Sequence, residues 1–211
     1  MGYKFIRVVL YIAYRLFFRF RSFGAENVPG AEDPRGVILA PNHSSFLDPP
    51  ILGISLKRPV TYLAKEYLFR KFIVRQALEA AGAHPIHSEA QDFRSIRQVI
   101  RLLKEGRRCV AVFPEGTRSP DGSLREAEGG LGFLAIKSVC WVVPVYIRGT
   151  YEAFPRDAKM FRMKPISVHY GKAFIPAQDP EILAAPDPYL AVGQRTMREI
   201  QLVKAEADKK V

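Results

Sequence analysis

The sequence of 211 residues is poor in cysteine: it has two, Cys109 and Cys140, and both lie in apolar runs typical of buried strands. So few cysteines exclude a disulfide framework and fit a reducing compartment. No internal repeat or low-complexity tract is present, which excludes repeat architectures and long biased tails. Residues 1–23 contain no acidic residue, and their longest uncharged run, residues 8–14, is much shorter than the about 20 apolar residues of a membrane-spanning helix.

What the sequence does contain is the composition of a folded chain, with 48% hydrophobic and 25% charged residues. The length suits one domain and a short appendage. The formal charge is +11, because 32 basic residues face 21 acidic ones. This excess predicts an anionic partner, for which nucleic acid, an anionic membrane surface and a phosphorylated substrate are the candidates.

Residues 1–23 carry five of the positive charges. On a helical wheel, these charges fall in one broad sector together with Tyr3, Tyr11 and Tyr14, opposite an apolar sector. The charged residues are Lys4, Arg7, Arg15, Arg19 and Arg21, and the apolar ones are Phe5, Ile6, Val9, Leu10, Ile12, Ala13, Leu16, Phe17 and Phe20. The segment lacks the cleavage site of a signal peptide. We therefore expect residues 1–23 to form an amphipathic helix that lies in the membrane interface, and residues 24–211 to form the main domain. The alternative is a helix that packs on its own domain. If the helix binds the membrane, deletion of residues 1–22 should release the protein from it.

The main domain alternates apolar runs with segments of helical spacing. Strands are expected over residues 37–40, 59–64, 83–86, 109–113, 141–147 and 166–170, and helices over residues 49–56, 65–81, 92–105, 129–138 and 186–210. This alternation predicts an α/β fold with a mixed, largely parallel sheet flanked by helices. Pro144 falls inside one expected strand, which indicates an edge, a bulge or a strand end there.

A His and an Asp follow the first expected strand of the main domain. His43 lies just past the break at Pro41-Asn42, and Asp48 comes five residues later, where a new helix can begin. A carboxylate beside an imidazole holds one ring nitrogen as a donor and leaves the other free to take a proton. His43 and Asp48 are therefore candidates for a general base and its orienting group. The alternative is a pair that caps a loop and a helix.

A second polar block, Glu115-Gly116-Thr117-Arg118, follows the expected strand 109–113. Arg118 has the donor fork that fits a phosphate, and Gly116 lets backbone N–H groups approach an anion. Thr117 adds a hydroxyl, and Glu115 is expected to orient Arg118 or a loop N–H, or to receive a hydrogen bond from an acceptor. Because ligands collect at the carboxyl ends of parallel strands, this block and His43 should share one site.

The two blocks, followed by Val143-Pro144-Val145, resemble the glycerolipid acyltransferase family, and in particular the bacterial 1-acylglycerol-3-phosphate acyltransferases, over residues 24–175. The resemblance implies transfer of an acyl group from acyl carrier protein or coenzyme A to the free hydroxyl of a lysophospholipid, giving phosphatidic acid. It implies no metal and no cofactor beyond that acyl thioester. Together with the amphipathic arm, it implies a peripheral or monotopic enzyme at the cytoplasmic face of the cell membrane, bound to an anionic surface.

One position departs from the family pattern. The family usually carries an arginine that helps to bind the acceptor phosphate where this chain has Ser88. Arg94, Arg97 and Lys65 are candidates to replace it, and an amino-lipid or lyso-ornithine-type acceptor is an alternative. A non-catalytic membrane-binding domain is a second alternative, although it would have no need of all the motif residues. Nucleic-acid binding has only the charge in its favour.

Overall fold

The computed structural model describes residues 2–65, 70, 75, 83–86, 93–106 and 109–209. In chain order the elements are α1 (Gly2–Phe18), β1 (Arg21–Phe23), η1 (Ala25–Asn27), β2 (Val37–Pro41), α2 (Asp48–Ser55), β3 (Val60–Lys65), β4 (Ala83–Ile86), α4 (Phe93–Lys104), β5 (Cys109–Ala111), α5 (Gly130–Ser138), β6 (Trp141–Arg148), α6 (Thr150–Ala153), β7 (Ser167–Tyr170), η3 (Pro176–Gln178), α7 (Pro180–Leu183) and α8 (Pro188–Lys209). Most of the helix expected over 65–81, and Ser88, fall outside the described residues.

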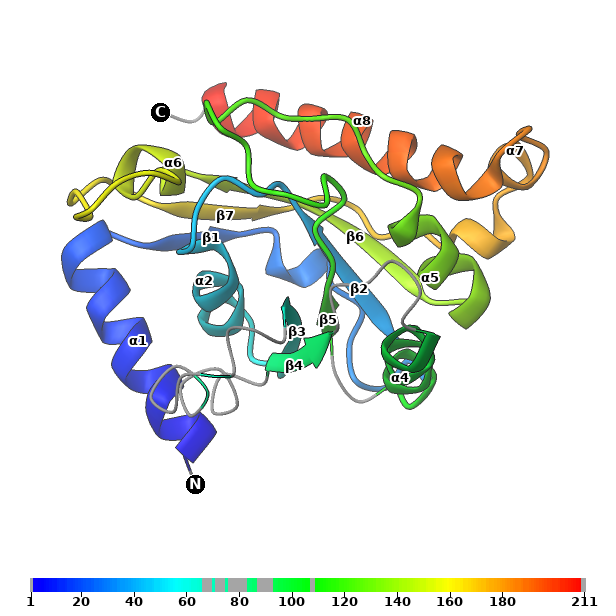
Figure 1. Ribbon diagram of the computed structural model, residues 1–211, viewed down its shortest axis with the longest axis horizontal. Helices are drawn as coiled ribbons and strands as arrows, with labels where there is room; N and C mark the ends of the chain where they lie inside the picture. The colour runs from blue at the N-terminus through cyan, green and yellow to red at the C-terminus, as the bar shows by residue number, and fades with distance from the viewer. Residues whose placement is uncertain are drawn as a thin grey trace.

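The strands form one seven-stranded sheet in the order β1-β7-β6-β2-β5-β3-β4. Every neighbouring pair is parallel except β6 and β7, which are antiparallel. The prediction of a mixed, largely parallel α/β sheet is therefore confirmed. Because β2, β5 and β6 run in the same direction, the segments that follow them all leave the sheet at the carboxyl ends of these strands (Figure 1).

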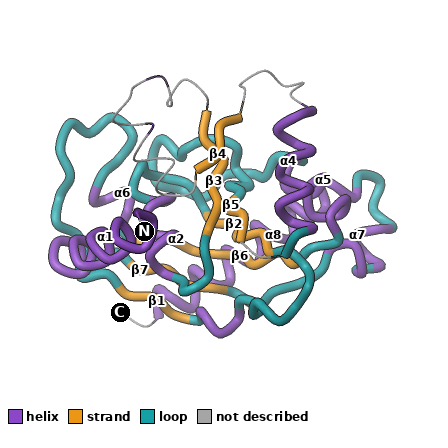
Figure 2. The backbone as a smooth tube through the Cα atoms, turned by 90° about the horizontal axis from the view of Figure 1, so that it is seen from below, coloured by secondary structure: helices purple, strands orange, loops and turns teal. Residues whose placement is uncertain are grey.

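Helices cover both faces of the sheet, as a largely parallel sheet requires. In β2, Val37 and Leu39 point into a core that includes residues of α1 and α2, while Ile38 and Ala40 point into a second core that includes residues of α4 and α5. Figure 2 shows the strands between these two groups of helices. Helix α8 packs against β6 on the α5 side of the sheet through a smaller cluster.

Helix α1 is shorter than the predicted arm and is built into the domain. It ends at Phe18, and Arg21–Phe23 form an edge strand that pairs with β7, so the expected helix over residues 1–23 is wrong in its last five residues. Tyr14, expected beside the charges, is buried, and its hydroxyl donates to the Leu47 carbonyl oxygen at 3.2 Å. Burial, followed by the nearby Asp48 carboxylate, raises the pKa of this hydroxyl. The wheel could not show which sector faces the domain.

The outer side of α1 remains apolar and exposed. Among the described side chains of α1, the exposed large hydrophobic ones are Val8, Val9, Tyr11, Ile12, Leu16 and Phe17, and Leu16 is 73% exposed. The loop between α6 and β7 continues this surface, because the Phe161 ring lies 6.5 Å from that of Phe17. Figure 1 shows this loop beside the C-terminal end of α1. The arm therefore both packs on the domain and presents an apolar surface outward. We call Val8, Val9, Ile12, Leu16, Phe17, Met160, Phe161 and Met163 the apolar face.

Pro144 lies within β6, opposite Ala40 of β2. On the other side of β6, Val145 pairs with Tyr170 and Val142 bridges to Phe174. Tyr170 and Phe174 are four positions apart in the chain, whereas Val142 and Val145, which they face, are three positions apart. This offset is a bulge in the segment from Tyr170 to Phe174, which faces Pro144, and it accommodates a residue that has no N–H to donate. A bulge was one of the three arrangements expected around Pro144.

Candidate active site

An amide side chain continues the hydrogen bonding of β2 beyond its last residue. The Asn42 amide donates to the Ile147 carbonyl oxygen at 3.1 Å and accepts from the Ile147 N–H at 2.7 Å. This pair of hydrogen bonds extends the β2–β6 ladder by one residue beyond Pro41. His43 is therefore held at the carboxyl edge of the sheet, where ligands of such folds bind.

His43 and Asp48, which the sequence analysis proposed as a pair, are in contact. The His43 Nδ1 atom lies 2.8 Å from Asp48 Oδ2. The same oxygen accepts the backbone N–H groups of Ser44 and Ser45, both at 2.8 Å. Asp48 is fully buried and begins α2, where the helix dipole favours a negative charge. Because a carboxylate only accepts, Nδ1 carries the proton and Nε2 is left as the acceptor.

The loop after β5 packs against the imidazole of His43 and holds its backbone. The Phe113 ring stacks on the His43 ring with 3.9 Å between centroids. Glu115 accepts the N–H of His43 at 2.9 Å and that of Arg125 at 3.3 Å. Burial raises the pKa of Glu115 to about 7, although these hydrogen bonds act in the opposite direction. With 3% of its surface exposed, Glu115 holds loop N–H groups, one of its expected roles, and has little surface for a substrate.

Arg118 lies beside the His43 turn, as expected. Its guanidinium carbon is 3.6 Å above the centroid of the Phe46 ring, and Phe46 belongs to the turn between His43 and Asp48. The next residue, Ser119, donates its N–H to the His43 carbonyl oxygen at 2.7 Å. The two motif loops are therefore bonded to each other on both sides of His43.

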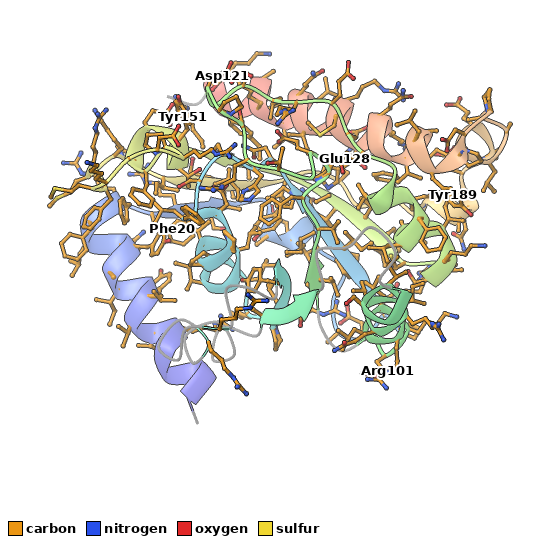
Figure 3. The ribbon with its side chains drawn as sticks, in the orientation of Figure 1. Phe20, Arg101, Asp121, Glu128, Tyr151 and Tyr189 are labelled. Atoms are coloured by element: carbon orange, nitrogen blue, oxygen red, sulfur yellow. The ribbon has the colours of Figure 1, made fainter. Side chains whose placement is uncertain are left out.

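Gly116 and Thr117 are exposed at the surface of the same loop. Gly116 has a φ of 66°, and a Cβ at this position would meet the Glu128 carboxylate. The left-handed conformation therefore favours glycine, whereas the Glu128 carboxylate is the end of a flexible side chain that can move away. Figure 3 labels Glu128, which lies in the segment leading to α5.

The serines next to His43 are engaged elsewhere. Ser44 Oγ lies 3.2 Å from Thr150 Oγ1, and Ser45 Oγ donates to the Phe154 carbonyl oxygen at 2.7 Å. Both contacts are with α6 or the residue that follows it, so these hydroxyls position the turn. The part of the chain that the structure describes holds no group of three or more His, Cys, Asp or Glu side chains placed for a metal ion.

Sequence reasoning missed Phe46, Phe113, Thr150 and Phe154 as parts of the site. Phe46 lies between His43 and Asp48, and Phe113 comes two residues before Glu115, so their aromatic character was the available signal. No pattern pointed to α6. Of the residues proposed to replace the family arginine, Arg97 lies on α4, and the side chains of Lys65 and Arg94 fall outside the described residues.

A comparison with family models decides the affiliation that the motifs suggested. The model described as Acyltransferase matches residues 19–148. The chain belongs to this family. Among its relatives, the chloroplastic 1-acyl-sn-glycerol-3-phosphate acyltransferase LPAT1 of Arabidopsis thaliana is 34% identical over 147 residues, which is 68% of this chain and 40% of the relative. The 1-acyl-sn-glycerol-3-phosphate acyltransferase of Bacillus subtilis is 32% identical over 120 residues, 56% of this chain and 58% of the relative.

The fold also matches a solved structure of the acyltransferase family. The crystal structure of the 1-acyl-sn-glycerophosphate acyltransferase PlsC from Thermotoga maritima has a TM-score of 0.74 and 25% identity. The match covers 98% of this chain and 79% of that one. By contrast, the chain spans only about two fifths of the length of the Arabidopsis thaliana relative and about three fifths of the length of the Bacillus subtilis relative.

Proposed function

We propose that this protein transfers a fatty acyl group from a thioester to the free hydroxyl of 1-acylglycerol-3-phosphate and so forms phosphatidic acid. The observation that carries the proposal is the contact of 2.8 Å between His43 Nδ1 and the buried Asp48 carboxylate, which leaves Nε2 as a proton acceptor. The names of the acyltransferase relatives support the choice of reaction and of acceptor. The acyl thioester is the only co-substrate in this scheme.

The proposed reaction needs one base. His43 Nε2 takes the proton of the acceptor hydroxyl as its oxygen attacks the thioester carbonyl carbon. A carbon–oxygen bond forms, the tetrahedral intermediate collapses, and the carbon–sulfur bond breaks. The imidazolium, stabilised by Asp48, then returns the proton to the thiolate. No acyl-enzyme is formed, and the engaged hydroxyls of Ser44 and Ser45 fit that scheme.

Arg118 is the proposed ligand of the acceptor phosphate. Its guanidinium is a bidentate donor, and its place over Phe46 sets it beside the His43 turn. A phosphate held there would fix the distance between the glycerol hydroxyl and His43, which contributes orientation. Gly116 and Thr117, exposed on the same loop, are proposed to contribute backbone and hydroxyl donors.

The apolar face is proposed to enter the bilayer from the cytoplasmic side, because both substrates carry acyl chains. None of the described helices has the length and hydropathy of a membrane-spanning segment. Exposed apolar side chains on α1, together with Met160, Phe161 and Met163 on the neighbouring loop, are typical of an interfacial contact. Nearby cations would meet anionic headgroups.

Membrane binding is tested better by substitution than by deletion. Tyr14, Phe18 and Phe20 belong to the hydrophobic core, so loss of residues 1–22 would disturb the fold as well as the apolar face. We expect the double variant Ile12→Ser/Leu16→Ser to bind phosphatidylglycerol vesicles more than about tenfold more weakly, because two apolar side chains lose their burial. Leu183→Ser/Leu202→Ser removes exposed leucines from α7 and α8 and is the matched control. Equal losses in the two variants would contradict the proposed face.

The activity is tested with labelled acyl-coenzyme A and acyl carrier protein thioesters against a panel of lyso-lipids, with mass-spectrometric identification of the product. We expect 1-acylglycerol-3-phosphate to be acylated in preference to phosphate-free acceptors. The panel includes a lyso-ornithine lipid, because Ser88 departs from the family pattern. Preference for the phosphate-free acceptor would replace the proposed substrate, and no acylation of any acceptor would refute the reaction.

A further inference from the structure

A cavity of about 500 Å³ lies at the end of α1, outside the candidate active site. Its lining comes from the junction of α1 and β1, the end of β6, α6, the start of β7 and the end of α8. Four cations line it, namely Arg19, Arg21, Arg148 and Lys164, against one carboxylate, Glu152. None of the residues of the His43 and Glu115 blocks belongs to this lining.

The sheet register sets the polar groups of the cavity in a row. Arg21 of β1 pairs with Ser167 of β7, and Ser167 pairs with Arg148 of β6. Directly paired residues point to the same face of a sheet, and two strand spacings separate the two arginine Cα atoms by about 10 Å. Two guanidinium groups therefore flank one hydroxyl. The Ser167 hydroxyl in turn lies 2.9 Å from His169 Nε2.

Most of this positive charge is not neutralised by the protein. Arg148 Nη1 lies 3.8 Å from Asp208 Oδ1. Within the described part of the chain, Arg19, Arg21 and Lys164 have no ion-pair partner. Cations that converge on one cavity repel each other, and an anion that accepts several hydrogen bonds from them would relieve that repulsion.

Arg19 is held in a strained backbone conformation. Its φ is 45°, and it directly follows the last residue of α1, a position where glycine is the usual residue. A left-handed conformation is unfavourable for a non-glycine residue, because its Cβ comes too close to the following carbonyl oxygen. The chain on both sides is fixed, since Phe18 accepts from the Ile166 N–H and Arg21 donates to the Ile166 carbonyl oxygen. Val139 takes the same conformation directly after α5, with a φ of 52°, so strain alone does not mark a site; Arg19 differs from it in lining the cavity.

From these observations we propose that the cavity binds a phosphate group, with Arg21, Ser167 and Arg148 as its central ligands and Arg19 and Lys164 as further cations. The headgroup of an acidic phospholipid is the source that the surroundings favour. Phe17 and Phe161 of the apolar face come just before Arg19 and Lys164 in the chain. In Figure 1 the end of α1, the loop before β7 and the C-terminal end of α8 lie on the same side of the molecule. The lipid source depends on the membrane placement proposed above, whereas the phosphate site does not.

The test compares Arg19→Gly/Arg21→Gln with the control Lys137→Gln/Lys172→Gln, which removes two exposed charges outside the cavity lining. Binding of the full chain is measured on phosphatidylcholine vesicles with and without phosphatidylglycerol. We expect the cavity variant to lose about 25-fold in affinity for the anionic vesicles, about fivefold for each cation, and the control less than about twofold. Ser167→Ala, which removes no charge, should also weaken anionic binding without changing binding to phosphatidylcholine alone. Equal losses in the cavity variant and the control would overturn the proposal.

A second measurement separates the two sources of phosphate. The melting temperature is recorded with increasing glycerol 3-phosphate. A rise in the wild type that is absent in Arg21→Gln would support the phosphate site and replace the lipid by a soluble ligand. No rise, together with the vesicle difference, supports the lipid headgroup. Without ligand, Arg19→Gly should melt at or above the wild-type temperature because strain is relieved, and a lower value would assign Arg19 a structural role and overturn its part in the site. These measurements record binding and stability, so they are independent of acyl transfer.

Discussion

Replacing Asp48 by asparagine removes the negative charge beside His43 and keeps the shape of the side chain. The amide oxygen can take the place of Oδ2 and accept from His43, Ser44 and Ser45, so the ring keeps its orientation. What the variant loses is the stabilisation of the imidazolium. Two unit charges about 4 Å apart interact by about 4 kcal/mol at an effective dielectric constant of about 20. Since about 1.4 kcal/mol corresponds to a factor of ten, we expect kcat to fall by about 10³.

The same substitution should have a smaller effect on stability. Asp48 Oδ1 is buried and has no hydrogen-bond partner within the described part of the chain, so the amide nitrogen would be a buried donor without an acceptor. Such a group costs about 1–3 kcal/mol. In a protein of this size, each kcal/mol lowers the melting temperature by about 2–4 °C. The folded variant therefore remains available for assay at moderate temperature.

The assay measures kcat for acylation of 1-acylglycerol-3-phosphate in mixed micelles, with the melting temperature recorded alongside. Asp48 is proposed to act through His43, so Asp48→Asn combined with His43→Ala should lose no more activity than His43→Ala alone. Fully additive losses in the double variant, or a kcat for Asp48→Asn within tenfold of the wild type, would refute the reasoning.

Three further predictions concern the support of the site and of the fold. The pKa of Glu115 is raised from 4.5 to about 7, so its contribution to stability is full below pH 4.5 and is lost as the pH rises through about 7. The free energy of unfolding, measured between pH 4 and 8, should show this decline in the wild type. Glu115→Gln should lack it. Arg118→Ala should raise the KM for the acceptor more than the KM for the thioester, and Arg118→Lys should restore only part of the loss, because lysine cannot bind bidentately; the reverse pattern of KM values would assign Arg118 to the donor. In Gly132→Ala a Cβ would overlap the backbone carbonyl oxygen of Tyr189 on α8; Figure 3 labels Tyr189. We expect the free energy of unfolding, measured with denaturant, to fall by about 1–3 kcal/mol. The control Gly130→Ala places its Cβ in open space, so its free energy of unfolding should fall much less.

The central strands could be predicted because their signals are local. The central strand β2 is a short apolar run between Gly36 and the break at Pro41-Asn42, and its prediction at 37–40 differs from the observed strand only by Pro41. At the edge of the sheet, the predicted strand at 83–86 has the observed bounds of β4. The contact of His43 with Asp48 could be predicted for the same reason, since a single turn joins them. The Glu115 block could be placed near His43 because both follow parallel strands, and the carboxyl ends of parallel strands lie on the same side of a sheet.

What could not be predicted depends on distant partners. Arg21–Phe23 form a strand only because β7 lies beside them, and three partly exposed residues carry no strand pattern of their own. Tyr14 is buried because α2 covers it, which a helical wheel cannot show. The stacking of Arg118 on Phe46 and the row of Arg21, Ser167 and Arg148 join segments far apart in the chain.

The most direct test of the proposed chemistry is acyl transfer by His43→Ala. The variant should fold and bind vesicles as the wild type does, because the ring contributes one stacking contact with Phe113 and one hydrogen bond to Asp48. Transfer of labelled acyl groups to 1-acylglycerol-3-phosphate should fall to the rate without enzyme. Appreciable residual transfer by the folded variant would show that a group other than this imidazole takes the proton.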